Sequence, residues 1–339
     1  MANPRWCLAV LLALVATLLV APGASARADR GAQPRKAPRT TRVVVITLDG
    51  FGTYALRRLG PDRAPVLHRM LDRGAGTLDA RTEREMTATL PNHTGMVTGR
   101  RIEADHGGHG VFWNDERLEP ATVQEAAGHR VASMFSVVRA DGGRPALFTS
   151  KPKLSLLDRS WPQGIARFVL EPNNDTLARM TRRDLRHRGR ALTMLHLSWP
   201  DGAGHEHGFS SKAYLEACEH ADQLVGTVLR TIRSKRSLRR HTAVVVTADH
   251  GGRGDGHDDP TKLANYRIPF VAWGAGVADG ADLYDLNPDY RDPDHRRTRY
   301  QAARQPVRNG DVANVVVRLL GLDPVPGSRF GRDAALDLR

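Results

Sequence analysis

Three apolar, β-branched runs in this sequence each end at an aspartate. Such runs alternate along the chain with helix-like spacing, which indicates a largely parallel sheet covered by helices. Loops beyond the carboxyl ends of parallel strands surround the ligand crevice, so we expect the three carboxylates to converge on one site. Taken singly, each aspartate is also explained as a turn former or a helix N-cap. The runs and their aspartates are Val43–Leu48 with Asp49, Leu192–Trp199 with Asp201, and Ala243–Ala248 with Asp249.

The remaining patterns complete the expected fold, a three-layer α/β/α sandwich with a central, mostly parallel sheet. Of the 339 residues, 40% are hydrophobic and 26% are charged, which allows a sizeable core and excludes a disordered or multi-span membrane chain. Further strands are predicted at Val131–Val137, Ala146–Thr149 and Pro269–Trp273. Helices are predicted at Ala64–Arg73, Tyr214–Ile232 and Asp311–Leu320.

The first residues predict export. Residues 6–21 form one apolar run, followed by the small residues Ala24-Ser25-Ala26 that a signal peptidase reads. We expect residues 1–26 to be a cleaved signal, 27–42 a basic flexible leader and 43–339 a single catalytic domain, secreted to the extracellular or cell-envelope space. The alternative is an uncleaved anchor, but sixteen residues fall short of the roughly 20 that a membrane span needs.

The chain is basic, with 50 lysines and arginines against 37 acidic residues and a formal charge of +13. Much of the excess lies in three runs, at 27–42, 181–190 and 230–241. A solvated surface is the favoured interpretation of such runs, although an anionic partner is conceivable. The sequence has no zinc finger, RNP-type aromatic pattern or helix-turn-helix, so no specific nucleic-acid module is expected.

Histidines cluster beside two of the three aspartates. Oxygen and nitrogen ligands without cysteine suit zinc, or less well manganese or another divalent ion. Six ligands exceed what one tetrahedral ion takes from protein, so two divalent metal ions are expected, each with an open position. The two predicted ligand sets are Asp201, His205 and His257, and Asp49, Asp249 and His250.

A hydroxyl nucleophile is offered by Thr89. Pro91 suits the first turn of a helix, which would continue to Gly99 and place Thr89 at its N-terminus, where free N–H groups favour a phosphoryl group. Asn92, one turn away, could donate its amide to a phosphoryl oxygen. Local chemistry alone explains Thr89 as an N-cap, and the aspartate and histidine cluster favours the nucleophile.

These residues resemble the alkaline phosphatase superfamily, and within it the type I phosphodiesterase/nucleotide pyrophosphatase family. Four motifs carry the resemblance in the right order: V-I-T-L-D-G-F at 45–51, T-L-P-N-H-T-G-M-V-T-G at 89–99, D-G-A-G-H-E-H-G at 201–208 and T-A-D-H-G-G at 247–252. Shorter stretches at 146–151, 267–270 and 308–313 extend it over the mature domain. The resemblance implies an alkaline phosphatase-like fold.

The resemblance also implies roles for single residues. Asp49, Thr89, Asp249 and His250 would hold one zinc, with Thr89 as nucleophile through a phospho-enzyme intermediate. Asp201, His205 and His257 would hold the other. His257 departs from the nucleotide pyrophosphatases, whose corresponding ligand lies far downstream, and resembles the phosphomutase branch instead. His207 is a rival ligand, whereas His106 and His109 are expected to be structural or to support the ligands.

The expected function is therefore a secreted, metal-dependent hydrolase of phosphate diesters or nucleotide pyrophosphates. Asn92 matches the asparagine that contacts the phosphoryl group in the diesterases. A sulfatase is disfavoured because T-L-P-N-H lacks the modified cysteine or serine and the arginine, and a phosphomutase because the chain is exported. The alternatives are a phosphomonoesterase, which would require a cation such as Lys151, Lys153 or Arg100 in the site, and a non-catalytic exported binding protein.

Overall fold

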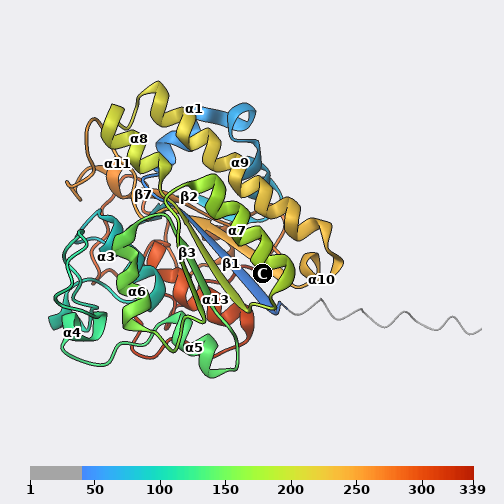
Figure 1. The fold of residues 1–339 in the computed structure, drawn as a ribbon. Helices are drawn as coiled ribbons and strands as arrows, with labels where there is room; N and C mark the ends of the chain where they lie inside the picture. Colours follow the sequence, from blue (N-terminus) through green and yellow to red (C-terminus); the bar gives the residue numbers. More distant parts are fainter. Residues whose placement is uncertain (1–39) are drawn as a thin grey trace, which may run out of the picture. The chain divides into compact units, whose positions relative to one another are not determined.

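The structure, a computed structural model, describes residues 40–339. Its core is an eight-stranded sheet in the order β4-β3-β5-β1-β6-β7-β2-β8 (Figure 1). The strands are β1 Arg42–Leu48, β2 Ala75–Arg81, β3 Ala146–Thr149, β4 Arg167–Leu170, β5 Leu192–Leu197, β6 Thr242–Thr247, β7 Arg267–Gly274 and β8 Ala281–Asp282.

The sheet is mostly parallel, as predicted. Strand β1 pairs in parallel with β5 on one side and β6 on the other, and β3 pairs in parallel with β5 and β4. Strand β7 is antiparallel to both β6 and β2. The three predicted aspartates therefore follow three neighbouring parallel strands, β5, β1 and β6, whose carboxyl ends share one edge of the sheet.

Helices cover both faces of the sheet, which confirms the three-layer fold. Helices α1, α2, α7 and α8 pack around the long α9 on one face, whereas α3, α5 and α13 pack together on the other (Figure 1). The α-helices are α1 Thr53–Arg63, α2 Pro65–Asp72, α3 Thr89–Thr98, α4 Val123–Ala127, α5 Met134–Ala140, α6 Ser155–Ser160, α7 Asn174–His187, α8 Trp199–His207, α9 Lys212–Ser234, α10 Arg236–Arg239, α11 Leu263–Tyr266, α12 Leu283–Leu286 and α13 Val312–Leu320. Short 3-10 helices are η1 Ala104–His106, η2 Pro152–Leu154 and η3 Asn309–Asp311.

One predicted strand is wrong. Val131–Val137 does not form a strand, because Ser133 begins helix α5 by a capping box in which Ser133 and Ser136 exchange side-chain to main-chain hydrogen bonds. Strands β2, β4 and β8 were not predicted from the sequence. The β2 sequence AGTLDAR has too few β-branched residues to stand out.

The region around Asp201 also differs in detail. Strand β5 ends at Leu197, and Pro200 lies in the first turn of α8, so Asp201 is helical rather than in a loop. The predicted signal at 1–26 and all but the end of the predicted leader at 27–42 lie outside the described residues. Within residues 40–339, no helix has the length and apolar character needed to span a membrane.

Candidate active site

The three predicted carboxylates meet at the carboxyl edge of β5, β1 and β6. Asp49 and Asp249 are fully buried, and Asp201 is 3% exposed. Gly50 makes the close approach possible: its φ is +68°, and a Cβ there would lie 2.9 Å from the Cα of Asp201. A side chain at this position would therefore push the β1 loop away from α8.

One predicted ligand set surrounds Asp49. The His250 Nε2 lies 3.4 Å from Asp49 Oδ1 and 3.4 Å from Asp249 Oδ2. The Thr89 hydroxyl lies at the same distance, 3.4 Å, from Asp49 Oδ1. The hydroxyl thus lies beside the ligand set, as the sequence predicts.

The second predicted ligand set surrounds Asp201. Its Oδ1 lies 3.4 Å from the Nε2 of His205 and 3.6 Å from the Nε2 of His257. The two histidine Nε2 atoms lie 3.1 Å apart. Between the two sets, His250 Nε2 lies 3.8 Å from Asp201 Oδ1, so the sets are immediate neighbours.

These distances fit divalent metal ions. Ligand atoms about 2.0–2.1 Å from a tetrahedral ion lie about 3.3 Å from one another, close to the separations within each set. Three of the atoms that would coordinate, Asp201 Oδ1, Asp249 Oδ2 and His250 Nε2, are buried without a hydrogen bond among the described residues. A buried polar atom without a partner lowers the stability of the fold, and a bound cation would be that partner.

The histidine rings are oriented for coordination through Nε2. His250 Nδ1 lies 2.8 Å from the Gly251 carbonyl, and His257 Nδ1 bonds the Thr87 carbonyl. A ring that donates through Nδ1 carries its lone pair on Nε2. Burial lowers the pKa of both histidines, that of His257 to about 3, so both rings are neutral and able to bind an ion.

The carboxylates carry an unusual charge balance. Burial favours a high pKa for Asp49, yet the Lys151 ammonium and a hydrogen bond from His196 hold the pKa well below its usual range. Burial and the neighbouring Asp49 raise the pKa of Asp249 well above its usual range. Three buried carboxylates with one ammonium retain excess negative charge, which divalent ions would neutralise.

Thr89 is the first residue of α3, and the helix N-cap is Ala88. The Thr89 side chain makes no capping hydrogen bond, so the N-cap explanation of this threonine is wrong. Instead its hydroxyl lies 3.4 Å from both Asp49 Oδ1 and Lys151 Nζ. The helix ends at Gly99 in the left-handed conformation, as expected of a C-terminal glycine.

Asn92 does not offer its amide to a substrate. Its Nδ2 donates to the carbonyls of Met86 and Ala88, at 2.9 and 3.0 Å, and its Oδ1 accepts the main-chain N–H of Glu83 and the Asn309 amide. The side chain is fully buried. Both of its amide hydrogens are engaged, so Asn92 holds the segment before α3 in place.

Asn114 is the amide that lies at the start of α3. Its Oδ1 accepts the N–H of Leu90 at 3.0 Å, next to Thr89. No hydrogen bond of its Nδ2 is recorded among residues 40–339, and the residue is half-buried. The sequence interpretation missed it because it lies 25 residues beyond Thr89.

Lys151 is the second functional side chain that the main sequence interpretation missed. Its Nζ lies 2.8 Å from Asp49 Oδ2 and 2.5 Å from Asp201 Oδ2. It lies two residues beyond β3, the strand next to β5, and this position at the same sheet edge is the signal that could have found it. His196 on β5 was also missed. Its Nε2 lies 2.8 Å from Asp49 Oδ2, and its Nδ1 lies 3.0 Å from the Thr149 hydroxyl.

The remaining candidates lie outside the two ligand sets. His207 is near Glu206, His106 is near Glu103, and the buried His109 accepts the N–H of Val111. Lys153 donates to the Asn114 carbonyl.

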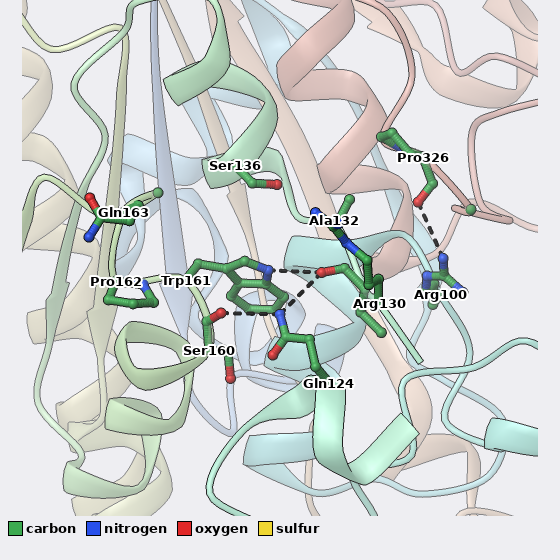
Figure 2. A pocket seen from close by; sticks show the side chains of 13 residues that line it. Arg100, Gln124, Arg130, Ala132, Ser136, Ser160, Trp161, Pro162, Gln163 and Pro326 are labelled. Carbon is green, nitrogen blue, oxygen red and sulfur yellow. Dashed lines mark hydrogen bonds between the residues drawn. The ribbon is translucent and has the colours of Figure 1, made fainter. Parts of the chain in front are cut away.

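Arg100 follows the C-terminal end of α3, whereas Thr89 lies at the N-terminal end of that helix. It lines a cavity of about 680 Å³ around Trp161 and Gln124 and donates to the carbonyl of Pro326 (Figure 2). Of the three cations considered for a monoesterase, Lys151 contacts the ligand sets and Lys153 supports the loop that carries Asn114.

Comparison with known proteins agrees with this fold. The sequence profile described as type I phosphodiesterase/nucleotide pyrophosphatase matches residues 43–306. Murine ectonucleotide pyrophosphatase/phosphodiesterase 5 superposes with a TM-score of 0.63 at 14% identity, over 84% of this chain and 96% of that chain. An inactive threonine-to-alanine variant of the murine protein, in complex with AMP, superposes equally well at 13% identity. At such identity the likeness shows the fold alone.

The chain also resembles curated proteins named as ethanolamine phosphate transferases. GPI ethanolamine phosphate transferase 1 of Neurospora crassa is 34% identical over 163 residues, which are 46% of this chain and 15% of the transferase. The Mus musculus protein of the same name is 23% identical over 322 residues, 87% of this chain and 32% of that protein. The chain therefore matches less than a third of the length of these transferases.

Proposed function

The chain belongs to the type I phosphodiesterase/nucleotide pyrophosphatase family, and from that membership we propose that it hydrolyses phosphate diesters with Thr89 as nucleophile and two bound divalent ions. One observation carries the proposal. In two Asp/His sets each histidine Nε2 lies 3.1–3.6 Å from the other ligand atoms of its set, and the Thr89 hydroxyl lies 3.4 Å from Asp49 in one of them.

Each ion has a defined set of residues. Asp49, Asp249, His250 and Thr89 would hold one ion, and Asp201, His205 and His257 the other. Nitrogen and oxygen ligands without cysteine suit zinc. When bound, the ions supply positive charge that neutralises the phosphoryl oxygens and favours the ionised threonine hydroxyl.

The chain's own residues perform the displacement. Thr89 Oγ1 loses its proton to solvent and forms a bond to phosphorus, while the bond from phosphorus to the leaving ester oxygen breaks and that oxygen takes up a proton from solvent to leave as an alcohol. Water then attacks phosphorus, the bond to Thr89 Oγ1 breaks, a proton of that water returns to the threonine oxygen, and the phosphate monoester leaves. The positive end of the α3 dipole lies at Thr89 and favours the negative phosphoryl group.

Asn114 and Lys151 are the proposed substrate contacts. We assign to the Asn114 amide the phosphoryl contact that the sequence suggests for Asn92, because its Oδ1 accepts the N–H of Leu90 at the start of α3 and its Nδ2 has no hydrogen bond among the described residues. Lys151 contributes a fixed positive charge 3.4 Å from the nucleophilic oxygen. Neutral and charged donors aimed at developing charge stabilise the transition state of phosphoryl transfer.

The relatives support a phosphate ester as substrate without selecting one. The curated relatives are named as ethanolamine phosphate transferases, and a murine structural neighbour binds AMP. Transfer and hydrolysis share the first displacement and differ in whether an alcohol or water attacks the phosphorylated residue. We propose water as the acceptor.

A phosphomonoesterase is the second candidate, and Lys151 is the observation that favours it. A monoester dianion gains more from a cation than a diester does, because charge-assisted hydrogen bonds are roughly twice as strong as neutral ones. Hydrolysis of bis-p-nitrophenyl phosphate compared with p-nitrophenyl phosphate separates the two. We expect a higher kcat/KM for the diester, and a tenfold preference for the monoester would contradict the diesterase proposal.

Export is part of the proposed function. Residues 1–26 are proposed to be a cleaved signal, because an apolar run precedes a small-residue cleavage pattern. Residues 43–339 would form the single catalytic domain in the extracellular or cell-envelope space. N-terminal sequencing of the exported protein tests this: it should begin at Arg27, and a chain that retains Met1 would contradict cleavage.

A further inference from the structure

Two short segments carry a large local excess of positive charge. Residues 176–190 and 223–241 contain twelve arginines and lysines and one acidic residue, a net charge of +11 out of the chain's +13. The other 38 basic and 36 acidic residues almost balance. The excess is therefore local, and it creates a positive potential on one part of the surface.

The two segments lie together in space. The end of α7 contacts the end of α9 where Arg182 Nε donates to the Thr231 hydroxyl at 2.8 Å, and Lys235 Nζ donates to the Arg186 carbonyl at 3.0 Å. The one acidic residue, Asp184, is buried and accepts two hydrogen bonds from Arg190. We call this surface the basic face. Its exposed members are Arg179, Arg183, Arg186, Arg188, Arg230, Arg233, Lys235, Arg236, Arg239 and Arg240.

The basic face lies at the end of the sheet opposite the candidate active site. Its segments lead directly into the starts of β5 and β6. Arg42 at the start of β1 donates to the carbonyl of Ser237 in α10, and Figure 1 shows α10 near that end of β1. The seven residues of β1 separate the two ends by about 20 Å. A partner bound to the basic face thus leaves the catalytic edge open.

The basic face has a recess suited to a phosphate group. A cavity of about 420 Å³ is bordered by Arg167, Arg183, His187 and Arg188. Its one carboxylate, Asp184, is already paired with Arg190, so the guanidinium groups of Arg167, Arg183 and Arg188 give the recess a net positive charge. The planar guanidinium of arginine matches two phosphate oxygens at once, which lysine does not.

We propose that the basic face docks the exported protein on a bilayer that contains anionic phospholipid. The two segments have no Phe, Trp or Tyr, so the aromatic platforms on which single-stranded nucleic acids stack are absent from them. The signal predicted at residues 1–26 would also take the chain to a membrane during export. After cleavage, the basic face would retain the domain at that surface.

The test compares two variants with equal loss of charge. The first carries Arg183→Gln, Arg186→Gln, Arg236→Gln and Arg239→Gln on the basic face. The control carries Arg291→Gln, Arg296→Gln, Arg299→Gln and Arg304→Gln, exposed arginines in the loop after α12. Each exported protein is sedimented with phosphatidylcholine vesicles that contain or lack phosphatidylglycerol, and hydrolysis of a small soluble diester is measured in parallel.

We expect the wild type and the control to bind the anionic vesicles, with binding weakened by salt, and the basic-face variant to partition roughly 100-fold less. Hydrolysis of the soluble diester should be unchanged in the basic-face variant, which shows that the fold and site are intact. The proposal would be overturned if the wild type bound neutral and anionic vesicles equally, or if both variants lost vesicle binding to the same extent. Binding of oligonucleotides without binding of vesicles would also overturn it.

Discussion

The Lys151 ammonium lies 2.5 Å from Oδ2 of Asp201 and 2.8 Å from Oδ2 of Asp49, so it bridges the two ligand sets. The other oxygen of each aspartate, Oδ1, faces the histidine Nε2 atoms. The lysine and the proposed ions therefore use different oxygens and do not compete. Lys151 can fix the spacing of the two sets and still lie 3.4 Å from the Thr89 hydroxyl.

We predict that Lys151→Gln lowers kcat/KM for p-nitrophenyl phosphate about tenfold more than for bis-p-nitrophenyl phosphate, because the dianion depends more on a fixed cation. Steady-state kinetics with both substrates measures the difference. Lys153→Gln is the matched control, since that lysine supports the Asn114 loop and should affect both substrates alike. Equal losses for both substrates in Lys151→Gln would indicate that the lysine acts by holding Asp49 and Asp201 in place.

Removing metal should abolish turnover, because the buried carboxylates and neutral histidines have no other source of sufficient positive charge among the described residues. Chelation followed by zinc should restore activity. Asp249→Ala and His250→Ala should each lose bound metal, measured by elemental analysis of the purified variants. Full activity of chelated protein, or unchanged metal content in both variants, would contradict the two-ion site.

We predict that Thr89→Ala loses roughly 10³-fold or more in kcat, because the covalent route needs the hydroxyl. Thr89→Ser should retain appreciable activity. Metal content should change little in the alanine variant, since Asp49, Asp249 and His250 remain. Trapping of a phosphorylated protein by acid quench should succeed in the wild type and fail in Thr89→Ala. Wild-type turnover by the alanine variant would show that water attacks directly.

The sequence predicted the convergence of Asp49, Asp201 and Asp249 because strand ends can be recognised locally and parallel strands share an edge. It could not give the strand order. Only that order brings Lys151, beyond β3, and His196, on β5, against Asp49. Lys151 and His196 lie about 100 and 150 residues after β1 in the chain. No local sequence pattern shows that their strands join the same sheet as β1.

Local patterns also misled the prediction in two places. The Val131–Val137 run looks like a strand, yet the Ser133 capping box and the buried faces of Met134, Phe135 and Val138 make it a helix. Asn92 lies one turn from Thr89 and was therefore chosen as the phosphoryl contact. The structure shows that its hydrogens are engaged by main-chain carbonyls.

The two asparagines can be separated by experiment. Asn114→Ala should lower kcat about 10²–10³-fold, as expected for loss of a transition-state donor, and should cost less stability than Asn92→Ala, because only the Leu90 N–H loses a partner. Asn92→Ala should lower the free energy of unfolding by about 2–4 kcal/mol, because it leaves buried main-chain groups without partners. Urea denaturation and kinetics on both variants check this. A stable, inactive Asn92→Ala would restore Asn92 as the substrate contact.

Glu83 provides a prediction about pH and stability. The residue is fully buried, its Oε1 has no hydrogen bond among the described residues, and Tyr300 donates to its Oε2 at 2.8 Å. Burial and the nearby Glu85 raise the pKa of Glu83 to about 8. Because the pKa in the folded state is above that of the unfolded chain, stability is full below about pH 4.5 and declines as the pH rises through 8.

We therefore predict that ionisation of Glu83 lowers the free energy of unfolding of the wild type by about 1 kcal/mol between pH 7 and pH 9. Glu83→Gln should remove this contribution. Other groups titrate equally in both proteins, so the difference between the two urea-denaturation curves isolates Glu83. The exposed Glu116→Gln serves as control and should leave the pH dependence unchanged. Parallel curves for wild type and Glu83→Gln from pH 7 to 9 would show that Glu83 is already ionised at pH 7 in the folded protein.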